Sequence, residues 1–84
     1  MNIHKNPNLL VQQLRKLEGV HGVSYEYPGI FEVDTELGLI SLGDDGGVIT
    51  WNAFDASGYL EGETSAKTPA TIARDFGAWL RGEF

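Results

Sequence analysis

The chain has 84 residues, enough for one domain and too few for a second hydrophobic core. Hydrophobic residues make up 42% of it, which is typical of a chain that folds around a packed core. It contains no cysteine, so disulfides, thiolate metal sites and thiol redox chemistry are excluded. The net charge of −6 disfavours direct binding to nucleic acids and to anionic membranes, because both need clustered Lys and Arg.

The N-terminal segment carries the pattern of an amphipathic helix. Asn6 can cap it, and Pro7 fits the first helical position, where a missing N–H is harmless. Apolar side chains follow at helical spacing up to Leu17, and Gly19 can end the helix in a left-handed conformation. The pattern predicts a helix over Pro7–Glu18.

The middle of the chain alternates apolar and polar residues, as half-buried strands do. The alternation covers residues 23–27 and 31–34, and further strands are expected over 39–42, 48–54 and 59–64. The run from Gly43 to Gly47 predicts a tight turn, and Asp55 to Gly58 predicts another. The pattern leaves open whether Pro28-Gly29 is a hairpin turn or a bend within one long strand.

A second amphipathic helix is expected over Pro69–Arg81, capped by Thr68 and ended by Gly82. The order of helix, strands and helix predicts an α+β domain over residues 1–84. In this domain an antiparallel sheet of three to five strands carries both helices on one face. The expected core is Leu10, Leu14, Leu17, Tyr25, Phe31, Val33, Ile49, Trp51, Ile72, Phe76 and Trp79.

Charge is distributed unevenly along the chain. Lys and Arg are absent between Leu17 and Ala66, whereas this span holds every acidic residue except Asp75 and Glu83. If the apolar strand residues face the helices, alternation turns the intervening polar residues to water. That outward set is Glu26, Glu32, Asp34, Thr50, Asn52, Tyr59, Glu61 and Glu63. Crowded carboxylates repel one another and a basic partner would relieve this, although an acidic face can also serve only solubility.

No arrangement of catalytic or metal-binding residues stands out. His4 and His21 lack the spacing of a helical metal pair, and a turn explains Asp44-Asp45-Gly46-Gly47 better than a calcium loop does. Glu32 and Asp34 share a strand face, but no cleft is predicted that would separate their pKa values. The sequence predicts a protein that is not an enzyme and has no catalytic residues, metal site or cofactor.

The sequence also bears on location. The polar start of the chain lacks the apolar segment of a signal peptide, and no stretch approaches the length of a membrane span. The lack of cysteine favours a reducing compartment. A cytoplasmic location is expected.

In size, acidity, lack of cysteine and α+β pattern, the chain resembles small accessory proteins of bacteriophages and mobile elements, among them the anti-CRISPR inhibitors. Several of these present acidic surfaces that imitate nucleic acid. The resemblance implies an inhibitor that binds a basic protein, such as a nucleic-acid-binding effector, and competes with nucleic acid there. The candidate partner-binding residues, chosen by their charge, are Glu26, Glu32, Asp34, Glu36, Glu61 and Glu63.

A second interpretation stays open. Small domains gain stability by self-association, so the chain is alternatively a homo-oligomeric structural or scaffold protein that interacts through an apolar patch. A homodimer could form on an exposed sheet edge or on the helix face that carries Gly77. Salt distinguishes the two interpretations, because binding through an apolar patch is nearly insensitive to it.

Overall fold

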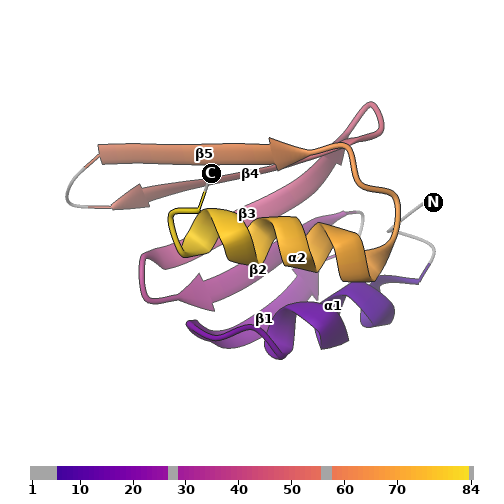
Figure 1. The fold of residues 1–84 in the computed structure, drawn as a ribbon, viewed down its shortest axis with the longest axis horizontal. Coiled ribbons are helices and arrows are strands. Elements are labelled where there is room, and N and C mark those ends of the chain that lie inside the picture. The colour runs from indigo at the N-terminus through magenta and orange to yellow at the C-terminus, as the bar shows by residue number, and fades with distance from the viewer. Residues whose placement is uncertain (1–5, 27–28, 56–57, 84) are drawn as a thin grey trace.

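The computed structural model describes residues 6–26, 29–55 and 58–83 and confirms the predicted α+β fold. The elements in chain order are α1 (Pro7–Arg15), β1 (Val20–Glu26), β2 (Ile30–Thr35), β3 (Gly38–Asp45), β4 (Val48–Asp55), β5 (Gly58–Thr64) and α2 (Pro69–Leu80). The two helices lie side by side against one face of the five-stranded sheet (Figure 1). Within residues 6–26, 29–55 and 58–83, no helix lies on the other face.

The sheet is an antiparallel meander in the order β1-β2-β3-β4-β5. Glu26 pairs with Ile30, and the Gly29 N–H donates to the Glu26 carbonyl over 2.9 Å, so the chain makes a hairpin turn there. Pro28 itself lies outside the described residues. The predicted turn between β3 and β4 is confirmed: Gly46 and Gly47 have φ of 62° and 92°, which a two-residue hairpin turn requires.

Both helices end earlier than predicted. α1 stops at Arg15 instead of Glu18, because the Leu17 N–H bonds to the Leu14 carbonyl in a tighter turn and Gly19 then adopts a φ of 88°. α2 stops at Leu80 instead of Arg81. In the described part of the chain, neither helix is long and apolar enough to cross a membrane.

The N-terminal caps differ between the helices. The Thr68 side chain accepts from the Thr71 N–H and forms a capping box, as its position predicted. Asn6 occupies the N-cap position of α1, but its side chain makes no capping hydrogen bond. The prediction that Asn6 caps α1 through its side chain is therefore wrong.

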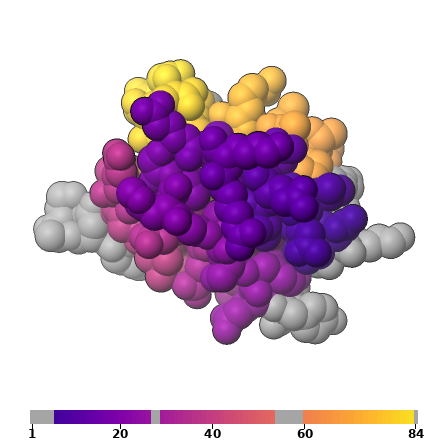
Figure 2. Space-filling view, turned by 90° about the horizontal axis from the view of Figure 1, so that it is seen from below, coloured from indigo at the N-terminus to yellow at the C-terminus, as the bar shows by residue number. Residues whose placement is uncertain are grey.

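The core lies between the helices and the sheet. Among the described residues, its buried apolar members are Leu10, Val11, Leu14, Val23, Phe31, Val33, Ile40, Leu42, Ile49, Trp51, Ala53, Ile72, Ala73 and Phe76. Leu17, Tyr25 and Trp79, also predicted as core, are partly buried against it. α1 contacts both β1 and α2, and Figure 2 views this side, where indigo and purple atoms form a continuous surface bordered by α2.

Gly77 is not available to another chain. It is buried in α2, and a Cβ there would lie 3.0 Å from Cδ2 of Leu17, beyond the end of α1. The missing side chain lets this part of the chain approach α2 closely. The expectation that the Gly77 face could form a homodimer interface is therefore wrong.

Candidate functional site

The face of the sheet opposite the helices is lined by side chains that all reach solvent. It is termed the open face here. Away from Asp45 and Val48, which flank the turn between β3 and β4, its described residues are Gly22, Ser24, Glu26, Ile30, Glu32, Asp34, Leu39, Ser41, Gly43, Thr50, Asn52, Glu61 and Glu63. Alternation along each strand explains the division, since neighbours such as Phe31 and Val33 point into the core and are fully buried.

Strand register sorts the carboxylates of the open face into two groups. Glu26, Glu32 and Asp34 lie on β1 and β2, whereas Glu61 and Glu63 lie on β5. The residues between them on β3 and β4 form a neutral strip, which consists of Ser41, Gly43, Thr50 and Asn52. Because three strand spacings of about 4.8 Å separate β2 from β5, the two groups come within about 14 Å of each other at their nearest backbones.

These carboxylates are electrostatically unbalanced. In the described part of the chain, ion pairs join Arg74 to Asp75 and Arg81 to Glu83, and neither pair includes a residue of the open face. Neighbours on one strand face, such as Glu61 and Glu63, are about 6.8 Å apart at their backbones. Two unit charges at that distance repel by about 0.6 kcal/mol in water. The face therefore favours any cation that can lie between them.

The cations of the described residues, Arg15, Lys16, Lys67, Arg74 and Arg81, lie in the two helices or beside their ends. Arg15 Nη2 donates to the Val23 carbonyl over 3.2 Å, and Lys67 Nζ donates to the Gly47 carbonyl over 2.8 Å. Arg81 lies beyond the end of α2, where its hydrogen bond to Glu83 raises the pKa of the guanidinium and lowers that of the carboxyl. In the described part of the chain, the ion pairs therefore belong to the helix side, whereas the open face carries carboxylates that are in neither pair.

Glu36 does not join the other candidate residues. It lies in the turn between β2 and β3 and lines a hollow of about 280 Å³ with Glu18, Gly19, Leu80 and Arg81. The guanidinium of Arg81 lines this hollow, whereas no Lys or Arg is among the described residues of the open face. The structure therefore brings together Glu26, Glu32 and Asp34 on one side and Glu61 and Glu63 on the other, and sets Glu36 apart.

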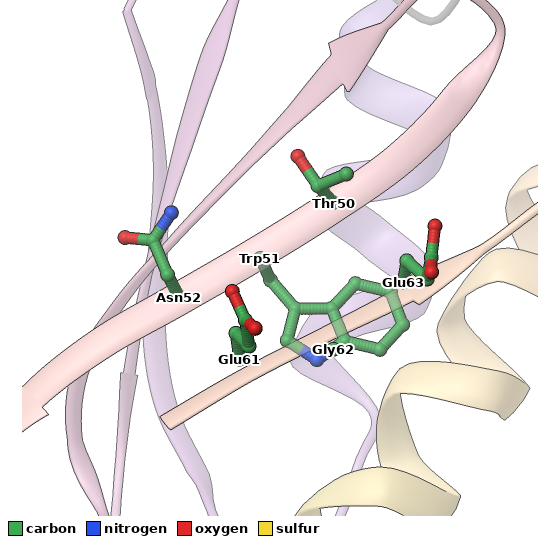
Figure 3. Close-up of a pocket in the computed structure, with 6 residues that line it drawn as sticks. All are labelled: Thr50, Trp51, Asn52, Glu61, Gly62 and Glu63. Carbon is green, nitrogen blue, oxygen red and sulfur yellow. The ribbon is translucent and has the colours of Figure 1, made fainter. Parts of the chain in front are cut away.

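A second hollow opens over β4 and β5 with a volume of about 520 Å³. Its lining residues are Thr50, Trp51, Asn52, Glu61, Gly62 and Glu63. Figure 3 shows the Trp51 indole extending beneath β5 at Gly62, while Thr50 and Asn52 leave β4 in other directions. Two carboxylates, an amide and a hydroxyl at the hollow can accept hydrogen bonds from a cationic group.

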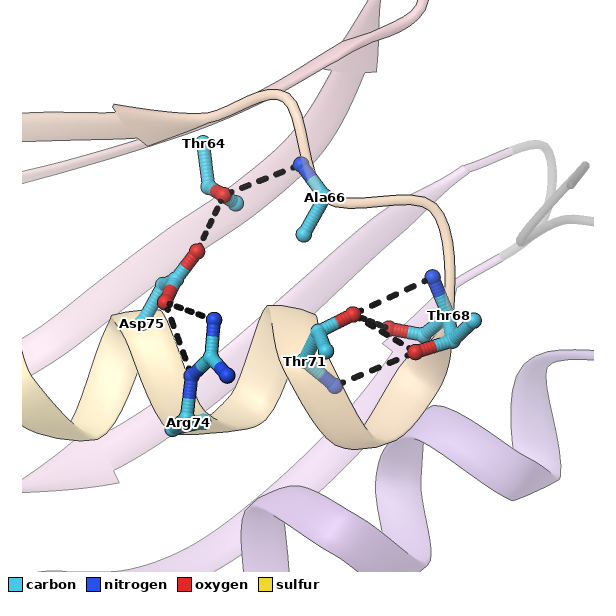
Figure 4. A network of polar contacts seen from close by, with 6 residues as sticks. All are labelled: Thr64, Ala66, Thr68, Thr71, Arg74 and Asp75. Carbon is cyan, nitrogen blue, oxygen red and sulfur yellow. Dashed lines mark hydrogen bonds and ion pairs between the residues drawn. The ribbon is translucent and has the colours of Figure 1, made fainter.

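The end of β5 is tied to α2 by a polar network (Figure 4). Thr64 Oγ1 donates to Asp75 Oδ2 over 2.7 Å and accepts from the Ala66 N–H over 3.1 Å. The bond from Thr64, aided by Arg74, lowers the pKa of the Asp75 carboxyl, although partial desolvation opposes the shift. Glu63 precedes Thr64 in β5, so the backbone that carries it is held close to this network.

Metal binding and histidine catalysis were also considered from the sequence. Within the described ranges, no three His, Asp or Glu side chains gather as metal ligands. His21 is exposed on β1 and lines neither hollow, and His4 lies outside the described residues. Comparison of the chain with protein-family models, curated proteins and solved structures finds no match. Any function must therefore be argued from the residues themselves.

Two features of the site were missed from the sequence. The neutral strip divides the acidic face, and its signal was present in the alternation of Ser41 and Gly43 with Leu42. The Trp79 Nε1–H donates to the Glu61 carbonyl over 3.1 Å, which ties α2 to the border of the sheet. No sequence pattern indicates that contact, because it joins elements of unrelated periodicity.

Proposed function

We propose that this protein is a non-enzymatic binding protein whose open face engages a basic protein surface and competes there with nucleic acid. The proposal is supported by the five carboxylates of an uncovered sheet face to which no described cation is paired. Repeated negative charge is the property by which basic protein surfaces attract a phosphate backbone. A phage-encoded inhibitor of the anti-CRISPR kind would act in this way on a nuclease, a CRISPR effector or a transcription regulator.

The two acidic groups set the kind of surface that fits. A partner needs two clusters of Lys or Arg about 14 Å apart, with a less charged region opposite the neutral strip. Each of these carboxylates stands on a backbone held in a hydrogen-bonded strand, so binding has to order little of the chain. Association is expected to be fast at low salt and to weaken steeply as salt rises.

The test begins with capture of partners by the full chain from its native host at low salt. A captured protein supports the proposal only if it binds nucleic acid and if the chain displaces a labelled oligonucleotide from it, measured by fluorescence anisotropy. The variant with Glu32→Lys, Asp34→Lys and Glu61→Lys is expected to lose displacement by at least about a hundredfold, since it reverses charge in both groups. Its fold is expected to persist, because it relieves repulsion at two exposed positions and one partly exposed position, Glu32.

A matched control separates the face from overall charge. Glu18→Lys, Glu36→Lys and Glu83→Lys change the net charge by the same amount at exposed positions outside the open face. This variant is expected to retain displacement within about threefold. Equal loss in both variants would show that only net charge matters. Binding that persists in molar salt, or a partner without a basic groove, would contradict the proposal.

The exposed apolar side chains favour a second candidate function. Leu39 is 54% exposed and Ile30 48% exposed on the open face, and Leu37 in the neighbouring turn is 38% exposed. They could form the apolar patch of a homo-oligomeric scaffold protein. Asp34 pairs across the strands with Leu39, however, so two copies packed face to face would bring carboxylates together. Light scattering at micromolar concentration tests this candidate: a monomer mass at low and high salt removes it.

A further inference from the structure

In the described part of the chain, the outer edge of β5 is a regular border of the sheet to which no further strand pairs. β5 stands last in the strand order, and its register with β4 runs without interruption from Gly58 to Thr64. The opposite border differs, since the pairing of β1 shifts between Val20 and Gly22 and β1 lies against α1. An uninterrupted edge strand is a template for another extended chain.

The register determines which backbone groups point outward. Asp45 and Val48 close the two-residue turn between β3 and β4, so they form a hydrogen-bonded pair. Alternation then makes Ser41–Asn52 a hydrogen-bonded pair as well, and Asn52 directs its backbone toward β3. Glu61, opposite Asn52 on the other side, must therefore direct its N–H and C=O to the free edge.

Independent geometry supports this assignment. The Glu61 carbonyl accepts the Trp79 Nε1–H over 3.1 Å. This bond can form only if the carbonyl points to the free edge, because an inward carbonyl would face β4. One lone pair of that oxygen remains. The same alternation turns the backbone of Glu63 outward, two residues along β5. Both carboxylates lie on the open face beside this edge and are exposed.

Charge selects what can pair there. A strand added to β5 would lie about 4.8 Å away, and its alternate side chains would stand beside Glu61 and Glu63 at the same spacing. A second copy of β5 would place carboxylates against carboxylates, which opposes self-pairing. Lys or Arg at alternate positions would instead meet both carboxylates while the backbones form hydrogen bonds.

We infer that the β5 edge takes up an extended segment of the basic partner, with Lys or Arg at alternate positions, as an added sixth strand. The inference rests on the proposed function and specifies how part of the open face is engaged. The hollow beside Glu61, Gly62 and Glu63 then receives the first basic side chain that crosses the edge. The acidic group on β1 and β2 remains available for the rest of the partner.

The test uses the full chain and three synthetic peptides, with amide hydrogen exchange followed by NMR. The probe alternates Lys and Thr; one control has the same sequence with N-methylated backbone amides on the pairing side, and the other replaces Lys by Glu. The probe is expected to slow exchange at the Glu61 and Glu63 amides by at least about tenfold. N-methylation is expected to weaken binding by at least about tenfold, and the Glu peptide is expected not to bind.

The outcomes distinguish the edge from the face. Equal affinity of the probe and its N-methylated form would overturn strand addition. So would slowed amide exchange that is confined to residues such as Glu32 and Ser41. The charge-reversal test of the open face would still stand in that case. Slow exchange at Glu63 that depends on protein concentration without peptide would instead identify a second copy as the occupant, and would also overturn the inference.

Discussion

Gly62 is the position where a single methyl group should disturb the fold most. A Cβ built there would lie 2.8 Å from Cε2 of Trp51 and 2.9 Å from Cδ1 of Trp79, and closer still to Nε1 of Trp51. The Trp51 indole cannot retreat, because its ring packs edge-on against Phe76 at 5.2 Å and against Trp79 at 5.8 Å. Gly62→Ala is therefore an overpacking substitution against the aromatic cluster of Trp51, Phe76 and Trp79.

The magnitude follows from two opposing effects. Overpacking of a filled core costs about 1 to 3 kcal/mol, and the lack of room around Trp51 puts Gly62→Ala at the upper end. Replacing a strand glycine by alanine returns about 0.5 to 1 kcal/mol. The net loss is about 2 kcal/mol, out of about 4 to 13 kcal/mol expected for a domain of this length. The melting temperature should fall by about 8 to 16 °C.

Urea unfolding followed by far-UV circular dichroism measures the loss without relying on tryptophan fluorescence. Gly22→Ala is the matched control, since Gly22 also lies in a strand and a Cβ there meets nothing within 4 Å. It should be neutral or stabilising by up to about 1 kcal/mol. In a Trp51→Phe background, the cost of Gly62→Ala should fall, because the clashing part of the Trp51 indole is gone and only the contact with the partly buried Trp79 remains. Equal urea midpoints for the two alanine variants would refute this packing.

Two further substitutions probe the ends of the elements. Thr68→Ala should lower stability by about 1 kcal/mol because it removes the capping box, whereas Asn6→Ala should cost much less, since the Asn6 side chain makes no cap; thermal unfolding compares them. Thr64→Val should cost about 1 to 2 kcal/mol at neutral pH by removing the hydrogen bond to Asp75. Because this bond lowers the pKa of Asp75 below its usual 3.8, its contribution is present above that pH. The contribution is lost as the pH falls through the lower folded value, so urea midpoints of wild type and variant should converge in acid.

The sequence predicted the fold because its local signals agree with one another. The structure confirms three of these signals: the apolar stripe of Ile72 and Phe76, the cap at Thr68, and the strand alternation around Phe31 and Val33. Helix ends were less predictable, since the early end of α1 depends on tight turn bonds that no single residue type dictates. Ile40 and Leu42 were not named as core because their run was short and bounded by glycines.

The candidate site was only half predictable. Alternation along one strand placed Glu61 and Glu63 on the same face, which the structure confirms. Their distance from Glu32 depends on how many strands intervene, and this follows from the meander rather than from any local pattern. Glu36 was chosen by its charge alone, and it lies beyond the end of β2, where strand alternation does not assign it to a face.

The binding face and the core are linked through β5, and this link makes a last prediction. α2 holds the strand at two points, through Trp79 on the Glu61 carbonyl and through Asp75 on the Thr64 hydroxyl. A strand held in this way presents its carboxylates at fixed spacing and loses less conformational freedom when a partner binds. Thr64→Val should therefore weaken partner binding by about threefold to tenfold although it removes no charge, with a faster dissociation rate in surface plasmon resonance. Thr68→Ala is the control. It should lower stability by a similar amount, but it acts at the N-terminus of α2 and removes no contact with β5. If both variants weaken binding equally, global stability rather than the position of β5 governs the interaction.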